Sequence, residues 1–184
     1  MRVVAGTAKG TRLARAPEGV RPLSARAREG LFSSLGEVVA GARVLDLYAG
    51  TGALGVEALS RGAERATFVD RAPESLRVVR ENLDRTGLAG GGRVVRSEAL
   101  RFVTRTDKDV ELYELVFLDP PYSEEASDLE RVLVGLTVGR LASPDWAAVL
   151  TRGRKSSMPV IPLDWRVARC LEYGDTLVFV YREA

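Results

Sequence analysis

Asp119, Pro120, Pro121 and Tyr122 directly follow the apolar run at 115–118. An exocyclic amine on a nucleobase attacks a methyl donor only when its lone pair is free, so its two hydrogens need acceptors. The Asp119 carboxylate and the Pro120 carbonyl are two such acceptors, and proline holds its backbone rigid. Tyr122 is suited to stack on the base. The tetrapeptide therefore favours chemistry at a base amine over a plain turn.

A glycine-rich turn follows another apolar run, at 44–48. Gly50, Gly52 and Gly55 have the spacing G-x-G-x-x-G, and glycines at this spacing between a strand and a helix let the backbone approach a ligand closely. Asp70 lies about 20 residues further on, where a carboxylate can accept hydrogens from both hydroxyls of a ribose. The pair predicts a cofactor that contains a nucleoside, and it fits NAD as well as S-adenosylmethionine.

Both motifs lie at the ends of predicted strands in an alternating pattern. Short apolar runs and turn residues predict strands at 44–48, 67–70, 93–96, 115–118, 146–150, 165–171 and 176–181. Helical periodicity predicts helices at 53–60, 73–84 and 129–136. This alternation predicts the α/β class, with a mostly parallel, doubly wound sheet. The last two strands resemble a hairpin and predict an antiparallel edge.

The amino-terminal segment differs from the rest. Residues 1–40 contain seven Lys and Arg against three Asp and Glu. Glycines between short apolar pairs predict a hairpin near the amino terminus. The apolar stripe at 24–35 predicts a helix, in which Gly30 costs about 1 kcal/mol relative to alanine. We expect residues 1–38 to be a basic RNA-binding extension packed on the main sheet, and residues 39–184 to be the catalytic domain.

Basic side chains near both motifs are candidates for phosphate contacts. The residues expected to contact RNA are Lys9, Arg12, Arg26, Arg28, Arg152, Arg154 and Lys155. For Arg28, an internal pair with Glu29 is the alternative. For the group as a whole, an ordinary solvated surface is the alternative.

Composition excludes several other classes. The chain has 184 residues, no histidine and a single cysteine, Cys170, so a histidine-based triad and an internal disulfide are both excluded. We expect no metal site, because no Cys or His cluster exists. No run approaches the roughly 18 apolar residues of a membrane span. These features predict a cytoplasmic protein with no membrane partner, and we expect a monomer.

The sequence also resembles a known family, the RsmD family of small-subunit ribosomal RNA guanine-N2 methyltransferases, over nearly the whole chain. The long glycine block at 45–63 and the block at 117–122 carry most of the resemblance. Shorter matching motifs are Arg2-Val3-Val4-Ala5-Gly6, Lys9-Gly10, Arg21-Pro22, residues 26–32 and Tyr173-Gly174-Asp175-Thr176. The resemblance implies a class I (Rossmann-like) methyltransferase fold that uses S-adenosylmethionine.

The resemblance also implies roles for single residues. Asp46, Gly50, Gly52 and Gly55 would line the cofactor pocket, and Asp70 would hold the ribose. Glu98 would meet the adenine amine, and the other expected cofactor-binding residues are Tyr48, Arg71 and Ala99. Tyr48 as a packed aromatic is the alternative.

This chain departs from the family pattern at five positions. Asp70 stands where Glu is frequent and Glu98 where Asp is usual, and both changes keep a carboxylate. Leu23 replaces Thr and Ser33 replaces Asn in the amino-terminal segment. Thr151 replaces a frequent Glu after the fifth strand.

The activity implied by the resemblance is transfer of the methyl group of S-adenosylmethionine to the N2 amine of a guanine in 16S ribosomal RNA. The partner would be that RNA, either free or in a partly assembled subunit. The alternatives are a DNA or RNA adenine-N6 amino-methyltransferase and a non-catalytic RNA-binding module on the same fold. A nicotinamide oxidoreductase is a more distant alternative, since no proton donor is evident near the site.

Overall fold

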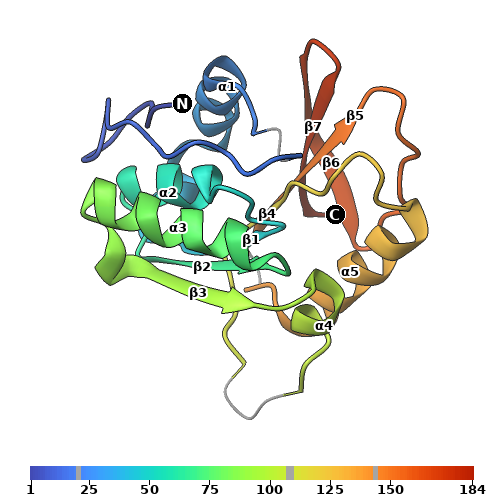
Figure 1. The fold of residues 1–184 in the computed structure, drawn as a ribbon. Coiled ribbons are helices and arrows are strands. Elements are labelled where there is room, and N and C mark those ends of the chain that lie inside the picture. Colours follow the sequence, from blue (N-terminus) through green and yellow to red (C-terminus); the bar gives the residue numbers. More distant parts are fainter. Residues whose placement is uncertain (20–21, 107–109, 143–144) are drawn as a thin grey trace.

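The computed structural model describes residues 1–19, 22–106, 110–142 and 145–184, so Arg21 lies outside the described residues. Seven strands form one sheet within this part of the chain, in the order β3-β2-β1-β4-β5-β7-β6 (Figure 1). The strands are β1 (Arg43–Leu47), β2 (Arg65–Asp70), β3 (Gly92–Arg96), β4 (Leu115–Leu118), β5 (Ala147–Gly153), β6 (Trp165–Tyr173) and β7 (Thr176–Glu183). The first five are parallel, and β7 runs antiparallel to β5 and β6. The predicted mixed sheet with an antiparallel edge is confirmed.

Helices cover both faces of this sheet (Figure 1). The described helices are α1 (Ala25–Leu35), α2 (Ala53–Ser60), α3 (Pro73–Thr86), α4 (Ala99–Val103) and α5 (Ala126–Gly139), with 3-10 turns η1 (Gly36–Val39) and η2 (Ala89–Gly91). Apolar residues of α1, α2 and α3 pack with one face of the sheet, and those of α4 and α5 pack with the other. The result is a three-layer sandwich, as expected for a doubly wound sheet.

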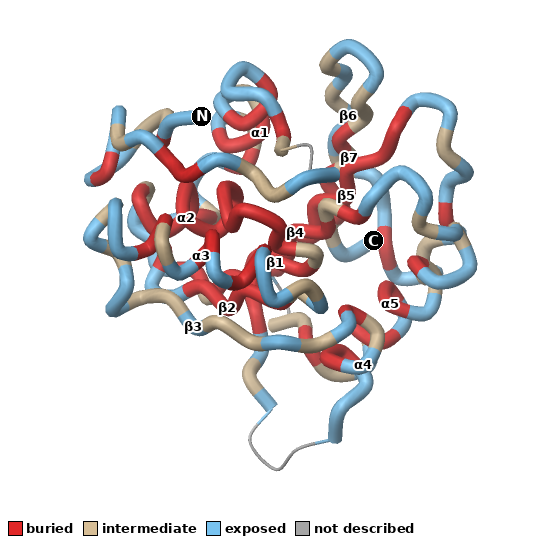
Figure 2. The backbone as a smooth tube through the Cα atoms, in the orientation of Figure 1, coloured by how far each residue is buried: buried red, intermediate tan, exposed pale blue. Residues whose placement is uncertain are grey.

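The central strands are buried on both faces. Phe117 of β4 packs in the core under α1 and α2, whereas its neighbours Val116 and Leu118 pack in the core under α4 and α5. This alternation follows from the two-residue period of a strand. Figure 2 shows the buried residues concentrated in the centre, while the edge strand β3 has no buried residue. The motifs that follow β1 and β4 are therefore held by the most deeply buried strands of the sheet.

The amino-terminal segment is fastened to α2. Arg2 and Arg12 form an antiparallel bridge, as the predicted hairpin requires. The buried Glu57 carboxylate accepts the backbone N–H groups of Val4 and Ala5, at 2.8 and 3.0 Å. At Gly6 the backbone passes so close to Ser60 that an added Cβ would lie 1.7 Å from the Ser60 carbonyl oxygen. This segment is docked on the sheet's helical layer.

Two differences from the sequence-based prediction bear on the site. The short helix α4 was not predicted, because five residues are too few to show a helical period. Strand β5 was expected to end at 150 but continues to Gly153, since Arg152 and Gly153 pair with Leu177 and Thr176 of β7. Thr151 and Arg152 therefore belong to the strand.

Candidate active site

A cavity of about 940 Å³ opens at the carboxyl ends of the parallel strands. It lies where the strand order reverses between β1 and β4, which is where doubly wound sheets bind their ligands. The turns after β1, β2, β3 and β4 all contribute to its wall, as do α1, α5 and the β6–β7 turn. The cavity brings together Gly50, Asp70, Glu98 and Asp119.

The glycine turn after β1 is tied to the end of β2. Asp70 accepts the backbone N–H of Gly50 at 2.9 Å through one carboxylate oxygen and that of Ala72 at 2.8 Å through the other. Asp70 therefore has a fixed orientation at the cavity wall. Tyr48, which begins this turn, has a φ of 58°, the one positive φ among the described residues that are not glycine.

Asp46 lies behind the glycine turn and does not line the cavity. Its carboxylate accepts the backbone N–H of Gly55 at 2.9 Å. Burial raises the pKa of Asp46 well above its ordinary value. An added Cβ on Gly55 would lie 2.3 Å from the Phe68 ring, so this glycine is required by packing. Gly50 lines the cavity, whereas Asp46, Gly52 and Gly55 do not line it and lie behind the turn.

The other residues predicted to bind a cofactor lie in the cavity wall. Tyr48 donates its hydroxyl to Glu124 at 3.1 Å, and burial raises its pKa. Arg71 follows Asp70, and Glu98 and Ala99 come from the start of α4. The predicted set thus divides into residues that line the cavity and residues that hold the glycine turn in place.

Asp119 lies in the wall of the same cavity, directly after β4. The hydroxyl of Thr151 on β5 donates to its Oδ1 atom. Burial raises the pKa of Asp119 to about 6, although the hydrogen bond from Thr151 acts in the opposite direction. At neutral pH this carboxyl group is mainly ionised and able to accept a hydrogen.

The rest of the tetrapeptide forms the rim. Pro120 is buried and Pro121 is exposed. Tyr122 is 44% exposed, its hydroxyl lies 2.8 Å from the hydroxyl of Thr176, and its ring lies against Gly153. The tyrosine is therefore anchored at its tip while much of its ring stays accessible for stacking.

A family model described as Conserved hypothetical protein 95 matches residues 1–182. A Bacillus subtilis protein, YlbH, is 35% identical over 184 residues, which cover 100% of this chain and 99% of that one. Ribosomal RNA small subunit methyltransferase D of Escherichia coli is 33% identical over 192 residues, which cover 100% of this chain and 91% of its own. The chain belongs to the family described as Conserved hypothetical protein 95. The solved structure of the Escherichia coli protein yhhF agrees, with a TM-score of 0.86, 31% identity, and coverage of 100% of this chain and 97% of that one.

Three of the five departures from the family pattern do not keep a carboxylate or were never one, and these three residues lie in different environments. Thr151 is 1% exposed and contacts Asp119, so it belongs to the site. Leu23 is buried and lines the cavity. Ser33 is exposed on α1 and does not line the cavity. Two of the three departures therefore affect the site directly.

The structure also places residues in the cavity wall that were not predicted from sequence. They include Ser75, Leu100, Glu124, Arg131, Tyr173 and Thr176. The sequence feature that could have indicated Tyr173 is Gly30, a glycine inside a helix that leaves space for a close neighbour. An added Cβ on Gly30 would lie 1.8 Å from the Tyr173 hydroxyl oxygen. The glycine that weakens α1 thus makes room for a tyrosine at the site.

Two of the cations expected to contact RNA are buried, which corrects that prediction. Arg28 is 0% exposed and donates to the Arg2 carbonyl at 2.7 Å; it makes no internal pair with Glu29, which is exposed. Arg152 is 1% exposed and donates to the carbonyls of Glu124 and Ser157. Both guanidinium groups fasten backbone segments. The remaining candidates, Lys9, Arg12, Arg26, Arg154 and Lys155, are exposed.

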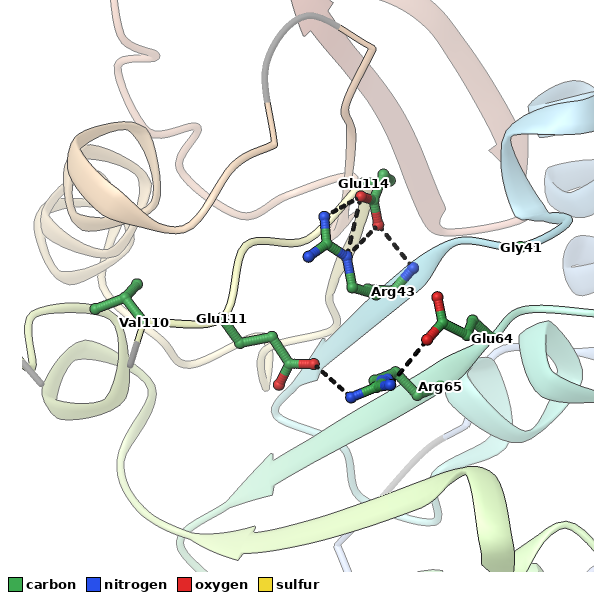
Figure 3. A pocket seen from close by; sticks show the side chains of 7 residues that line it. All are labelled: Gly41, Arg43, Glu64, Arg65, Val110, Glu111 and Glu114. Atoms are coloured by element: carbon green, nitrogen blue, oxygen red, sulfur yellow. Dashed lines mark hydrogen bonds and ion pairs between the residues drawn. The ribbon is translucent and has the colours of Figure 1, made fainter. Parts of the chain in front are cut away.

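A second hollow, of about 600 Å³, lies at the opposite ends of the strands (Figure 3). Its charged side chains pair with one another: Arg43 with Glu114, and Arg65 with both Glu64 and Glu111. Charges that are already matched leave little for a ligand, so this hollow is not a candidate site. Within the described ranges, no group of acidic or cysteine side chains is placed to hold a metal, and no helix is long and apolar enough to span a membrane.

Proposed function

We propose that this chain transfers the methyl group of S-adenosylmethionine to the N2 amine of a guanine in 16S ribosomal RNA. The observation that carries the proposal is that the Asp119 carboxylate and the glycine turn after β1 line one cavity. The names of the relatives support an RNA substrate, because the Escherichia coli relative is a ribosomal RNA small subunit methyltransferase.

The inner half of the cavity fits the cofactor. Asp70 is oriented by two backbone N–H groups, and its oxygens retain lone pairs that can accept the ribose hydroxyls. Glu98 would accept the adenine amine, and Arg71 and Ala99 would flank the nucleoside. When bound, S-adenosylmethionine supplies a methyl group that is activated by the positive charge on sulfur.

The outer half of the cavity fits the acceptor amine. Asp119 and the Pro120 carbonyl would take the two amine hydrogens, which leaves the nitrogen lone pair directed at the methyl carbon. Asp119 would also accept the proton that the amine loses when it gains the methyl group, and would release that proton to water. Alignment and exclusion of water supply most of the rate enhancement. Tyr122 would stack on the guanine, which must be unpaired or flipped out.

We further propose that residues 1–38 act as the RNA-binding extension of a catalytic domain at 39–184. The exposed cations Lys9, Arg12, Arg26, Arg154 and Lys155 would contact phosphates of the RNA. Arg154 now pairs with Glu172 at 2.7 Å and would exchange this partner for a phosphate. A cytoplasmic monomer suits this function, because a single chain supplies all the cavity residues named above.

The decisive experiment identifies the methylated nucleoside. The protein is incubated with labelled S-adenosylmethionine and, separately, with unmodified small-subunit RNA, partly assembled subunits and duplex DNA, and the products are digested and analysed by mass spectrometry. N2-methylguanosine from RNA or subunits is the expected result. Methylated adenine would favour the adenine-N6 alternative, and no label in any sample would favour a non-catalytic RNA-binding module.

A further inference from the structure

One of the two oxygens of the Asp119 carboxylate is already engaged. Leu118 of β4 pairs with Leu150 of β5, so the next residues along these parallel strands, Asp119 and Thr151, lie side by side. Thr151 is 1% exposed, and its hydroxyl donates to Asp119 Oδ1. The contact is therefore built by the register of two central strands.

We propose that Thr151 is a positioning residue, whose hydroxyl occupies Asp119 Oδ1 so that Oδ2 is left to accept a hydrogen of the substrate amine. A buried hydroxyl on a rigid strand fixes the rotation of the carboxylate. The catalytic consequence rests on the proposed function, whereas the contact itself does not. Pro120 would then accept the second amine hydrogen, and the amine would have one orientation.

The same bond favours the ionised form of Asp119. A carboxylate accepts an amine hydrogen through either oxygen, whereas a protonated carboxyl group presents a competing donor. Burial raises the pKa of Asp119 to about 6, and the hydrogen bond from Thr151 opposes that rise. The nearest acid behind the site is Asp46, whose own pKa is raised further by the charge on Asp119. The other charged or titratable groups that line the cavity come from the strand ends, the turns that follow them and α5: Tyr48, Asp70, Arg71, Glu98, Tyr122, Glu124, Asp128, Arg131 and Tyr173.

The contact can be tested without any substrate. The pKa of Asp119 is measured by carboxyl carbon-13 NMR, with the spectrum of Asp119→Asn used for assignment. Thr151→Val removes the hydroxyl and keeps the shape, and we expect the pKa of Asp119 to rise above its wild-type value of about 6. Thr151→Ser should restore it, and Thr151→Ala provides a second variant without the hydroxyl. Thr67→Val, a buried threonine on β2 that does not line the cavity, is the matched control.

An unchanged or lower pKa of Asp119 in Thr151→Val would overturn the proposal. If the hydroxyl instead accepted a hydrogen from protonated Asp119, its removal would lower the pKa of Asp119. In turnover, the loss of kcat/KM in Thr151→Val should be about fivefold greater at pH 6 than at pH 8.5, with no change in KM for S-adenosylmethionine. Equal losses at the two pH values would also contradict it. If the wild-type protein methylates no RNA, the proposed function fails while the NMR result still decides the role of Thr151.

Discussion

The two ends of strand β4 carry acidic residues in opposite situations. Glu114 precedes the strand and is matched, because Arg43 donates to it through both side-chain and backbone nitrogens (Figure 3). Asp119 follows the strand, and in the described part of the chain its carboxylate accepts from a neutral donor, Thr151. Burial acts to raise the pKa of both groups, but the hydrogen bonds from Arg43 outweigh it and lower the pKa of Glu114, whereas the pKa of Asp119 rises to about 6.

This comparison separates charges that stabilise the fold from charges that are left for a ligand. At the amino ends of the strands, the acids and arginines of the second hollow satisfy one another. At the carboxyl ends, the carboxylates of Asp70 and Asp119 accept only neutral donors and face a cavity. Exposed ion pairs contribute little stability, whereas a half-buried carboxylate that has no cationic partner costs free energy and is a candidate for function.

The sharpest test removes the acid at each end of β4 in turn. Asp119→Ala should lower kcat for methyl transfer by about 10²- to 10³-fold, because the acceptor for the amine hydrogen is lost. Binding of S-adenosylmethionine, measured by calorimetry, should remain. Glu114→Ala is the matched control and should keep the wild-type kcat. Similar losses of kcat in the two variants would show that the carboxyl end of β4 has no special role in methyl transfer.

A second test concerns the docking of the amino-terminal segment on α2. Gly6 and Gly10 both have a φ of +83°, but only Gly6 lies against the backbone of Ser60. Gly6→Ala should lower the free energy of unfolding by about 3 kcal/mol, from backbone strain and the clash together, and Gly10→Ala by about 1 kcal/mol. Chemical denaturation measures both. Equal losses would mean that the segment is not held at Ser60.

The inner half of the cavity can be tested separately from the outer half. Asp70→Asn should raise the KM for S-adenosylmethionine about thirtyfold with little change in kcat, because an amide accepts poorly from two ribose hydroxyls while also holding the turn. Steady-state kinetics measures this split. A fall in kcat at unchanged KM would place Asp70 in the chemical step instead.

Exposed cations at the two ends should contribute unequally to RNA binding. Lys155→Ala, at the cavity end, should weaken RNA affinity about threefold and reduce the slope of its salt dependence by about 1. Arg65→Ala, at the opposite end, should leave both unchanged, because its guanidinium pairs with Glu64 and Glu111. The same salt dependence in the two variants would mean that RNA does not approach the carboxyl end preferentially.

The smallest expected effect concerns the stability of the matched end. Arg43 and Glu114 are about one-third exposed. Glu114→Gln should lower the free energy of unfolding by less than about 1 kcal/mol at neutral pH. The loss should vanish in acid, because the lowered pKa of Glu114 means that the pair stabilises the fold only while the carboxyl group is ionised. A loss of several kcal/mol would show that this hollow is more than a surface network.

Local sequence signals predicted the strands and the two motifs well. The glycine turn and the double proline each interrupt an apolar run, so the positions of Gly50 and Asp119 at strand ends could be read directly. Parallel pairing then brings their carboxyl ends to one edge. The spacing after the glycine motif predicted the role of Asp70, and the family resemblance added that of Glu98; the structure shows both residues in the cavity wall.

Features that depend on distant partners could not be predicted. In the sequence, Arg28 and Arg152 cannot be distinguished from exposed arginines, and only the packed structure shows that they are buried. The extension of β5 through Thr151 depends on pairing with β7. The place of Tyr173 depends on Gly30, more than a hundred residues earlier in the chain. Each of these requires contacts between segments far apart in sequence.

The most direct measurement is a structure of the protein with S-adenosylhomocysteine and an RNA oligonucleotide that contains the target guanine. We expect N2 of a flipped guanine within about 3.2 Å of both Asp119 Oδ2 and the Pro120 carbonyl oxygen, with the ribose of the cofactor product on Asp70. A guanine bound away from Asp119, or S-adenosylhomocysteine bound at the amino ends of the strands, would contradict the proposed function.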